Sequence, residues 1–291
     1  MSRSIGILLV IISAASFGTL AILGRYAYAA GMDTFTMLFL RFGLAAVLMG
    51  ALLYARGERL PRGAALGKLA GMGAIGYVGQ AFCYLSALQY ASAGLVALLL
   101  YLYPAFVALL SVLVLGERLG RRRLLALGLA LLGTALTVGP AGGQWQGILL
   151  AVAAAVIYSV YIIVGAGVMK QVSAVQSSTV IFASAGAVYG GLALSSGLHL
   201  PSSPSGWLVV AALVLVATVI PVVTFLAGLE RIGPTNAAMY STLEPVVTVL
   251  LAALLFGETL DALALLGGGL ILAAVLLLTQ ADLRQPEAQA A

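Results

Sequence analysis

Charged residues are scarce in this chain. Asp, Glu, Lys and Arg together make up 8% of its 291 residues, whereas a soluble domain typically carries about 25%. Hydrophobic residues make up 63%, and the mean hydropathy is +1.14. The segments between the apolar runs are too short to form a separate soluble domain. This composition excludes a soluble globular domain and indicates a protein that lies almost wholly within a membrane.

Side chains that carry catalysis or bind metals are nearly absent as well. The chain has one cysteine, Cys83, and one histidine, His199, so it has no disulfide framework and no cysteine–histidine metal cluster. It also lacks an HExxH motif, paired aspartates within the apolar runs and a GxxxxGK[ST] phosphate loop. We therefore expect no catalytic residues, no metal and no other cofactor. An intramembrane enzyme is kept as a remote alternative.

What the chain does contain is apolar runs of a length that crosses a bilayer. A transmembrane helix needs about 20 mostly apolar residues, and the runs here are continuous, which favours helices over the alternating strands of a barrel. The predicted spans are residues 5–28, 34–54, 66–89, 92–115, 122–138, 147–169, 175–196, 207–229, 235–256 and 262–280. The predicted fold is an all-α polytopic membrane protein with ten transmembrane helices.

The second half of the sequence nearly repeats the first, without gaps and at one constant offset. Matching positions include Gly6-Ile7-Leu8-Leu9 with Gly147-Ile148-Leu149-Leu150, Pro104 with Pro245, and Gly116-Glu117 with Gly257-Glu258. We infer one duplicated unit of five helices, with a first repeat over residues 1–140 and a second over residues 141–291 that ends in a short cytoplasmic tail. Because five spans is an odd number, the second copy must be inverted in the bilayer, as in many secondary transporters.

Lysine and arginine set the expected orientation. Residues 139–146 and 197–206 carry neither, whereas the loops on the other side hold clusters such as Arg121, Arg122 and Arg123. The positive-inside rule then places both termini in the cytoplasm. This asymmetry accounts for the net charge of +5, so no nucleic-acid partner is expected and the basic loops lie near lipid headgroups. A cleaved signal peptide is disfavoured, because the first apolar run exceeds twenty residues and belongs to the repeat.

Small residues and prolines punctuate the spans. Four-residue spacings of small residues, which allow membrane helices to pack closely, occur at Gly67/Gly71, Ala151/Ala155/Ser159 and Gly186/Gly190. Pro104, Pro221 and Pro245 lie inside predicted spans, where proline removes a backbone hydrogen bond and interrupts the helix. Static packing kinks are one interpretation. We favour hinges beside a cavity, because paired interrupted helices are typical of a transport site.

Polar and aromatic side chains near these breaks are spaced so that they share helix faces. Asn236, Tyr240 and Glu244 are four residues apart and predict one stripe that leads to Pro245. The residues that we expect to contact a solute are Ser16, Phe17, Tyr77, Gln80, Tyr84, Tyr101, Tyr158, Asn236, Tyr240 and Glu244. A cavity walled by tyrosines with a few amides and hydroxyls suits a flat or aromatic organic solute.

Four charged residues near the spans have different expected roles. Glu244 is the one carboxylate predicted deep in the membrane, where it could carry a coupling proton, bind a substrate ammonium group or hold a structural hydrogen bond. Arg41 is the other candidate intramembrane charge; it is placed nearer the outer interface, where its long stem could snorkel, so a structural role is favoured over a substrate role. Glu117 and Glu258 follow glycines at the ends of spans and are expected to cap helices or close turns.

With these motifs, the chain resembles the EamA type of the drug/metabolite transporter superfamily along its whole length, and more narrowly the bacterial aromatic amino acid exporters within it. The residues that carry the resemblance are Ser16-Phe17-Gly18, Leu40-Arg41-Phe42, Tyr103-Pro104, Gly116-Glu117-Arg118-Leu119, Leu243-Glu244-Pro245 and Gly257-Glu258-Thr259-Leu260. The resemblance implies ten helices in two inverted halves, and a central cavity walled mainly by helices 1, 3, 4, 6, 8 and 9. It also implies export of amino acids or related metabolites.

Two branches of the superfamily fit less well. Its small four-helix relatives keep an essential glutamate in the first span, which this chain lacks, so their proton-antiport mechanism does not carry over. Sugar-phosphate carriers would need a lysine or arginine in the cavity, and no lysine lies deep in a span here.

Taken together, the sequence predicts a secondary transporter that exports amino acids, aromatic ones included, across the bacterial inner membrane by alternating access. A passive channel or facilitator for small metabolites is the alternative. The expected partners are the small-molecule substrate and the lipid bilayer, and one ten-helix unit is large enough to work as a monomer.

Overall fold

The computed structural model describes residues 3–87, 90–91, 96, 99–138, 144–257 and 262–283, and the regular secondary structure in those ranges is helical. The elements before residue 140 are α1 (Arg3–Gly18), α2 (Leu20–Ala29), α3 (Thr34–Ala55), α4 (Ala64–Gly71), the π-helical turn η1 (Met72–Tyr77), α5 (Val78–Ala87), α7 (Tyr103–Leu115) and α8 (Arg121–Val138). The absence of strands from the described residues agrees with the predicted all-α class.

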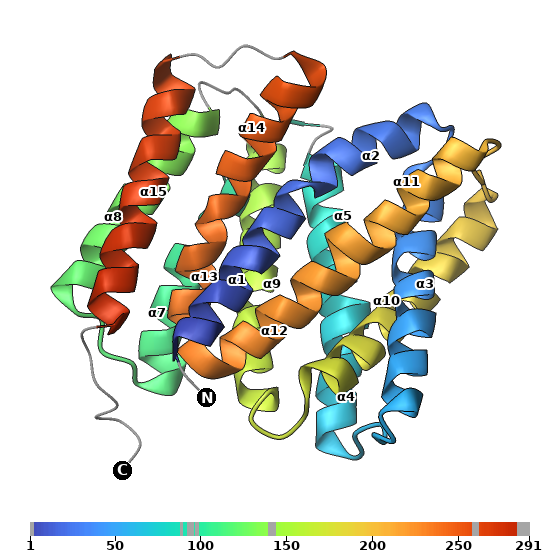
Figure 1. Cartoon of the computed structure of the whole chain (residues 1–291), viewed down its shortest axis with the longest axis horizontal. Helices are drawn as coiled ribbons and strands as arrows, with labels where there is room; N and C mark the ends of the chain where they lie inside the picture. Colours follow the sequence, from blue (N-terminus) through green and yellow to red (C-terminus); the bar gives the residue numbers. More distant parts are fainter. Residues whose placement is uncertain are drawn as a thin grey trace.

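The elements after residue 140 follow a related order. They are α9 (Trp145–Val168), α10 (Ala174–Ser196), α11 (Pro204–Val214), the π-helical turn η2 (Leu215–Val219), α12 (Ile220–Ile232), α13 (Pro234–Tyr240), the 3₁₀ turn η3 (Ser241–Leu243), α14 (Glu244–Phe256) and α15 (Ala262–Leu283). Helix α1 begins and α15 ends at the same end of the bundle (Figure 1).

Six helical segments are long and apolar enough to cross a membrane: Arg3–Ala29, Thr34–Ala55, Trp145–Val168, Ala174–Ser196, Pro204–Ile232 and Pro234–Phe256. Two shorter apolar helices, Tyr103–Leu115 and Leu265–Gln280, accompany them. The protein is therefore a polytopic membrane protein, as its composition predicts.

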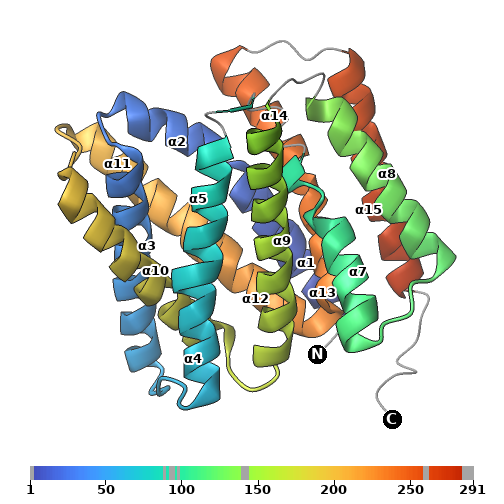
Figure 2. The same cartoon turned by 180° about the vertical axis from the view of Figure 1, so that it is seen from behind.

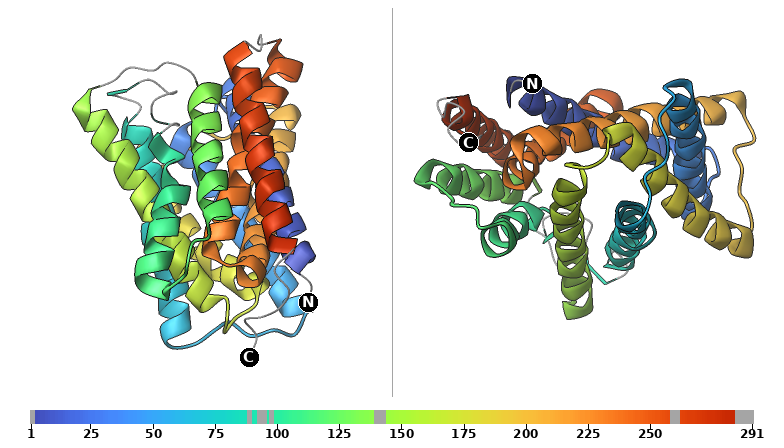
Figure 3. Two further views of the ribbon diagram at one scale, coloured as in Figure 1. Left: turned by 90° about the vertical axis from the view of Figure 1, so that its left-hand side faces the viewer. Right: turned by 90° about the horizontal axis from the view of Figure 1, so that it is seen from below.

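The helices that pack most extensively come from opposite halves of the chain. Helix α3 packs on α10, α8 on α15, α1 on α12, and α5 on α9. Figure 1 shows α8 and α15 lying side by side at one edge and α1 beside α12 at the centre, and Figure 2 shows α5, α7 and α9 on the opposite face. Seen from below, helices of the two halves lie next to each other around the molecule rather than forming two separate bundles (Figure 3). The two halves therefore share one core.

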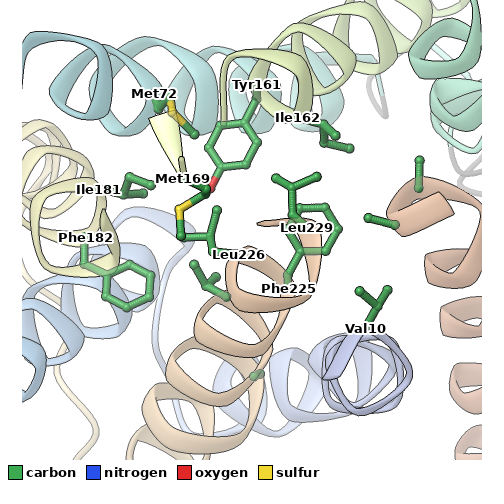
Figure 4. Packing of buried hydrophobic residues seen from close by; sticks show 14 of the residues in the cluster. Val10, Met72, Tyr161, Ile162, Met169, Ile181, Phe182, Phe225, Leu226 and Leu229 are labelled. Atoms are coloured by element: carbon green, nitrogen blue, oxygen red, sulfur yellow. The ribbon is translucent and has the colours of Figure 1, made fainter. Parts of the chain in front are cut away.

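That core is apolar and contains a few large side chains that are fully buried. Leu226 and Leu229 of α12 lie among Ile162 and Met169 of the α9 end and Ile181 of α10 (Figure 4). Apolar side chains gain little free energy when they move from lipid into the protein interior. Close van der Waals contact must therefore stabilise the packing of these helices.

Small residues allow that close contact, but not at every predicted position. Gly186 meets the backbone of Gly43, and Gly190 meets the ring of Phe39, so this spacing joins α10 to α3. The alanines at 151 and 155 and Ser159 are fully buried in α9. The prediction for Gly67 and Gly71 is wrong, since no heavy atom would lie within 4 Å of a Cβ there.

The predicted spans are interrupted more often than the sequence indicates. The first one breaks at Thr19, whose hydroxyl donates to the Ser16 carbonyl at 2.7 Å, and no sequence pattern points to this break. The two π-helical turns occupy equivalent places in the two repeats. Thr218 of η2 is the repeat counterpart of Tyr77 of η1, just as Pro245 is the counterpart of Pro104. A π-helical turn widens the helix and leaves carbonyl groups that need other donors.

Each of the three prolines stands in the first turn of an α-helical segment, and Pro221 and Pro245 lie within longer helical segments that continue through η2 and η3. Pro104 opens α7, Pro221 follows η2 at the start of α12, and Pro245 follows η3 at the start of α14. Proline is tolerated there because it has no N–H to contribute. The interruptions therefore precede the prolines. The hinge function remains a prediction.

Two contacts tie segments together near the helix ends. The Asp33 carboxylate accepts the backbone N–H groups of Phe35 and Thr36 at 3.2 Å and lies 3.5 Å from His199 Nδ1. Partial burial raises the pKa of the Asp33 carboxyl, but the hydrogen bonds and the His199 imidazole outweigh it and leave the pKa below its usual value. At the other end of the molecule, Glu117 accepts the Thr235 hydroxyl at 2.7 Å. The Glu117 side chain thus has a structural role, as expected, but it connects the end of α7 to α13 instead of capping the next helix, α8. Glu258 lies outside the described residues.

Gly73 provides a sharp test of the packing. An alanine methyl at this position would overlap the Ser184 hydroxyl and the Ile181 backbone oxygen of α10. Because backbone must then move, we expect Gly73→Ala to lower the melting temperature of the purified protein in detergent, with a free-energy cost of about 1–3 kcal/mol. Gly71→Ala, two residues away in open space, is the matched control and should melt like the unmodified protein. Equal melting of both variants would contradict the close approach of η1 to α10.

Candidate functional site

A row of aromatic rings runs through the interior and joins both halves of the chain. Tyr101 lies 6.4 Å from Tyr103, and Tyr103 lies 4.8 Å from Tyr158 in an edge-on contact, measured between ring centroids. Tyr158 stacks on Tyr161 at 5.9 Å, and Tyr161 meets Tyr77 edge-on at 5.3 Å. These spacings are those of favourable aromatic pairs. We call these five residues the tyrosine row.

The row continues past Tyr77 into the contact between α3 and α10. Phe42 lies 5.3 Å from Tyr77 and 5.8 Å from Tyr189, with its ring nearly parallel to that of Tyr189. Within the tyrosine row, Tyr103 and Tyr161 are buried, whereas Tyr77, Tyr101 and Tyr158 are partly exposed. Three of the predicted site residues are therefore brought together with part of their surface accessible.

Glu244 faces this row from the start of α14. Its charge acts on the hydroxyl groups of Tyr77, Tyr84, Tyr101, Tyr103 and Tyr158. The residue is partly exposed, and its carboxylate makes no hydrogen bond and no ion pair with any residue that the structure describes. A carboxylate at this depth is costly to leave unpaired, so Glu244 has free capacity to bind a proton or a cationic group.

The remaining predicted residues on α1 and α5 are also partly exposed. They are Ser16, Phe17, Gln80 and Tyr84. Phe17 packs against the core and is the repeat counterpart of Tyr158, so the two occupy equivalent positions in the halves. Glu244 is likewise the counterpart of Tyr103. The partly exposed residues thus include repeat-related positions from both halves.

Asn236 and Tyr240 do not join them. Tyr240 is fully buried and Asn236 is 3% exposed, with its amide donating to the Ile232 carbonyl of the preceding turn at 2.9 Å. Asn236 and Tyr240 of the expected stripe are therefore buried in this structure, whereas Glu244 is partly exposed, and contact of the three with a solute stays a prediction. The 3₁₀ turn η3 lies between Tyr240 and Glu244, so the regular helical spacing from which the stripe is predicted is interrupted there.

Arg41 is a functional candidate that the sequence places incorrectly. The residue is buried, 6% exposed, and does not snorkel toward an interface. Its Nε donates to the Thr218 hydroxyl at 2.6 Å, and one terminal nitrogen donates to the Ala217 carbonyl at 2.9 Å. Thr218 in turn donates to the Leu213 carbonyl five residues earlier at 2.7 Å. Arg41 of α3 thus supplies the donors that the widened turn η2 needs.

Arg41 and Glu244 form a separated pair of opposite charges. Each acts electrostatically on the other, and Tyr77 interacts with both, yet no ion pair within 4 Å joins them. Among the described residues, no group of three His, Cys, Asp or Glu side chains is close enough to hold a metal ion. The arrangement offers one anionic group, one cationic group and a set of ring faces, which suits binding of a small organic solute.

The contact between Arg41 and η2 leads to a stability prediction. Thr218→Val removes the acceptor of a buried charged donor, so we expect it to cost about 1–3 kcal/mol of stability, measured as a lower melting temperature in detergent. Thr179→Val is the control, because the Thr179 hydroxyl bonds only to the Val175 carbonyl of its own helix. If Thr218→Val melts no lower than Thr179→Val, the hydrogen bond from Arg41 does not hold η2.

Comparison with known proteins agrees with this architecture. The profile of the EamA-like transporter family matches residues 4–139 and again residues 145–280. An uncharacterized transporter of Archaeoglobus fulgidus is 31% identical over 276 residues, which cover 92% of this chain and 94% of that protein. The uncharacterized transporter YcbK of Bacillus subtilis is 29% identical over 119 residues, 39% of this chain and 38% of that protein.

A solved structure described only as "Crystal structure of protein" superposes with a TM-score of 0.83 at 25% identity, and the alignment covers 98% of this chain and 100% of that one. The two profile matches together span nearly the whole sequence, and the archaeal relative is aligned over almost its full length. The chain belongs to the EamA-like transporter family.

Proposed function

We propose that this protein is a secondary transporter that exports amino acids, aromatic ones included, across the cytoplasmic membrane of a bacterium by alternating access. The observation that carries the proposal is the tyrosine row with the unpaired Glu244 beside it. Ring faces offer a stacking surface for a flat side chain and attract an ammonium group. A carboxylate without a partner among the described residues is suited to bind that ammonium group or a coupling proton.

The proposed architecture is ten transmembrane helices in two inverted halves, residues 1–140 and 141–291, with both termini in the cytoplasm. Two pairs of packed helices support it, because α1 on α12 and α9 on α5 are equivalent pairs when the halves are exchanged. The packed pair of α8 and α15 also joins matching helices of the two repeats (Figure 1). Inverted repeats of this kind allow one half to rock against the other around a central site.

Alternating access requires helices that can bend without losing buried hydrogen bonds. The three prolines lie where helices already begin anew, beside η2, η3 and the turn before Tyr103. The Arg41 guanidinium donates to the carbonyl of Ala217, four residues before Pro221, at 2.9 Å, so a side chain satisfies the carbonyl that this proline leaves without its usual donor. In this proposal Pro104, Pro221 and Pro245 mark the places where the helices change direction during transport.

Uptake into proteoliposomes tests the substrate and the coupling. We expect labelled tryptophan and phenylalanine to enter, and threonine and a sugar phosphate to show whether the specificity is wider. Each is measured with and without a pH gradient. Acceleration by the gradient that is lost in Glu244→Gln would make Glu244 the proton carrier. Amino-acid uptake that ignores the gradient would identify a facilitator and assign Glu244 to binding or structure. Glu230→Gln, at an exposed surface position, is the matched control.

The tyrosine row leads to a separate prediction. Tyr158→Ala removes a ring at the centre of the row, so we expect uptake of tryptophan at low concentration to fall about tenfold or more, the loss typical of a central aromatic contact. Tyr54→Ala, at a side chain that is 89% exposed, should transport normally. The proposal fails if Tyr101→Ala, Tyr158→Ala and Glu244→Gln all insert properly and transport at the unmodified rate.

A further inference from the structure

Arg41 is a buried cation without an anion in contact. Its residue is 6% exposed, and the ion pairs among the described residues do not include it. Burying a charge is costly unless the charge is paired and hydrogen-bonded. The two hydrogen bonds to η2 satisfy part of the guanidinium, but they supply only neutral oxygen atoms. A counter-ion is therefore missing from the contacts that the described residues make.

The guanidinium is held in a fixed orientation that leaves one side free. Nε and one terminal nitrogen are engaged by Thr218 and Ala217, and the other terminal nitrogen makes no hydrogen bond with the described residues. The guanidinium also lies 4.9 Å from the centroid of the Phe42 ring. A planar guanidinium that is already oriented loses little entropy when it binds a carboxylate.

Glu244 provides the opposite charge at a distance. Its carboxylate and the guanidinium of Arg41 attract each other without touching, and Tyr77 of the tyrosine row interacts with both. Two opposite charges that both act on Tyr77 suit a zwitterion, in which an ammonium and a carboxylate group flank the same carbon atom. A solute with only one charge would leave the other protein charge buried without a partner.

We propose that Arg41 binds the carboxylate of the transported solute while Glu244 binds its ammonium group, so that the site selects zwitterionic α-amino acids whose side chains lie on the tyrosine row. This inference rests on the proposed function and adds the residue that recognises the carboxylate. It also joins recognition to conformation, because the guanidinium that binds the carboxylate is the one that holds η2. Solute binding would then act directly on the turn that precedes Pro221.

The test compares three related compounds in binding to the purified full-length protein. Tryptophan carries both charges, tryptamine lacks the carboxylate, and indole-3-propionate lacks the ammonium group. We expect the unmodified protein to bind tryptophan at least about tenfold more tightly than either analogue, since each lost charged hydrogen bond has an effect of that size. In Arg41→Gln the preference over tryptamine should disappear while the preference over indole-3-propionate remains. In Glu244→Gln the preference over indole-3-propionate should disappear while the preference over tryptamine remains.

Arg25→Gln is the matched control, because Arg25 lies over the Phe256 ring, away from the tyrosine row. It should keep both preferences. If Arg41→Gln fails to fold, Arg41→Lys replaces it, and the preference over tryptamine should fall several-fold because an ammonium group cannot contact η2 and a carboxylate as a guanidinium does. An unchanged preference in a folded Arg41 variant, or equal binding of tryptophan and tryptamine by the unmodified protein, overturns the inference.

The outcomes separate this inference from the proposed function. If the unmodified protein binds none of the three compounds and moves no amino acid in intact proteoliposomes, the proposed function fails and the inference fails with it. If the protein transports tryptophan but does not discriminate against tryptamine, the proposed function stands and the inference fails. Arg41 then has only the structural role of bonding to η2.

Discussion

The constraint on which this structure depends is that every carbonyl freed by a helix interruption needs a donor where water is scarce. Side chains from the opposite half donate to carbonyls at or beside these interruptions. Arg41 donates to Ala217, and Ser13 donates to the Pro221 carbonyl. In the other direction, Ser159 donates to the Tyr103 carbonyl at 3.2 Å, and Thr248 donates to the Gly18 carbonyl at 2.9 Å. Polar side chains of each half therefore donate hydrogen bonds to backbone carbonyls of the other half.

This mutual dependence explains why the interruptions and the candidate site coincide. A helix that breaks in lipid must lie against polar partners, so interruptions gather where the halves meet. The same region collects Tyr77 at the end of η1, Tyr103 at the start of α7 and Glu244 at the start of α14. Polar and aromatic groups are thus brought together at the interruptions by the need to satisfy the backbone.

The sequence predicts the helices and the aromatic content of the site, but not its charge arrangement. Tyr158 follows from helical spacing, because Tyr158 and Tyr161 lie within the regular helix α9. The same spacing does not extend from Tyr240 to Glu244, since the short change of winding at η3 between them is not visible in composition. Arg41 is misplaced for a related reason. From hydropathy alone, an arginine within a span is expected to reach toward the membrane interface. Arg41 instead bonds to Thr218 of the turn η2, which lies 177 residues away in the sequence.

The repeat also shows where the two halves have diverged. Arg41 corresponds to Phe182 and Glu244 corresponds to Tyr103, at the offset that relates the two halves throughout. Each charged residue is thus replaced by an aromatic one at the equivalent place in the other half. The backbone keeps the approximate symmetry that rocking between two similar states needs, while the charges are present in one copy each. A zwitterion is itself asymmetric, and a site with two cations and two anions related by symmetry would hold it in two orientations and leave two charges unpaired. In the proposed mechanism, one cation and one anion from different halves would fix a single orientation of the solute and place it between the two halves.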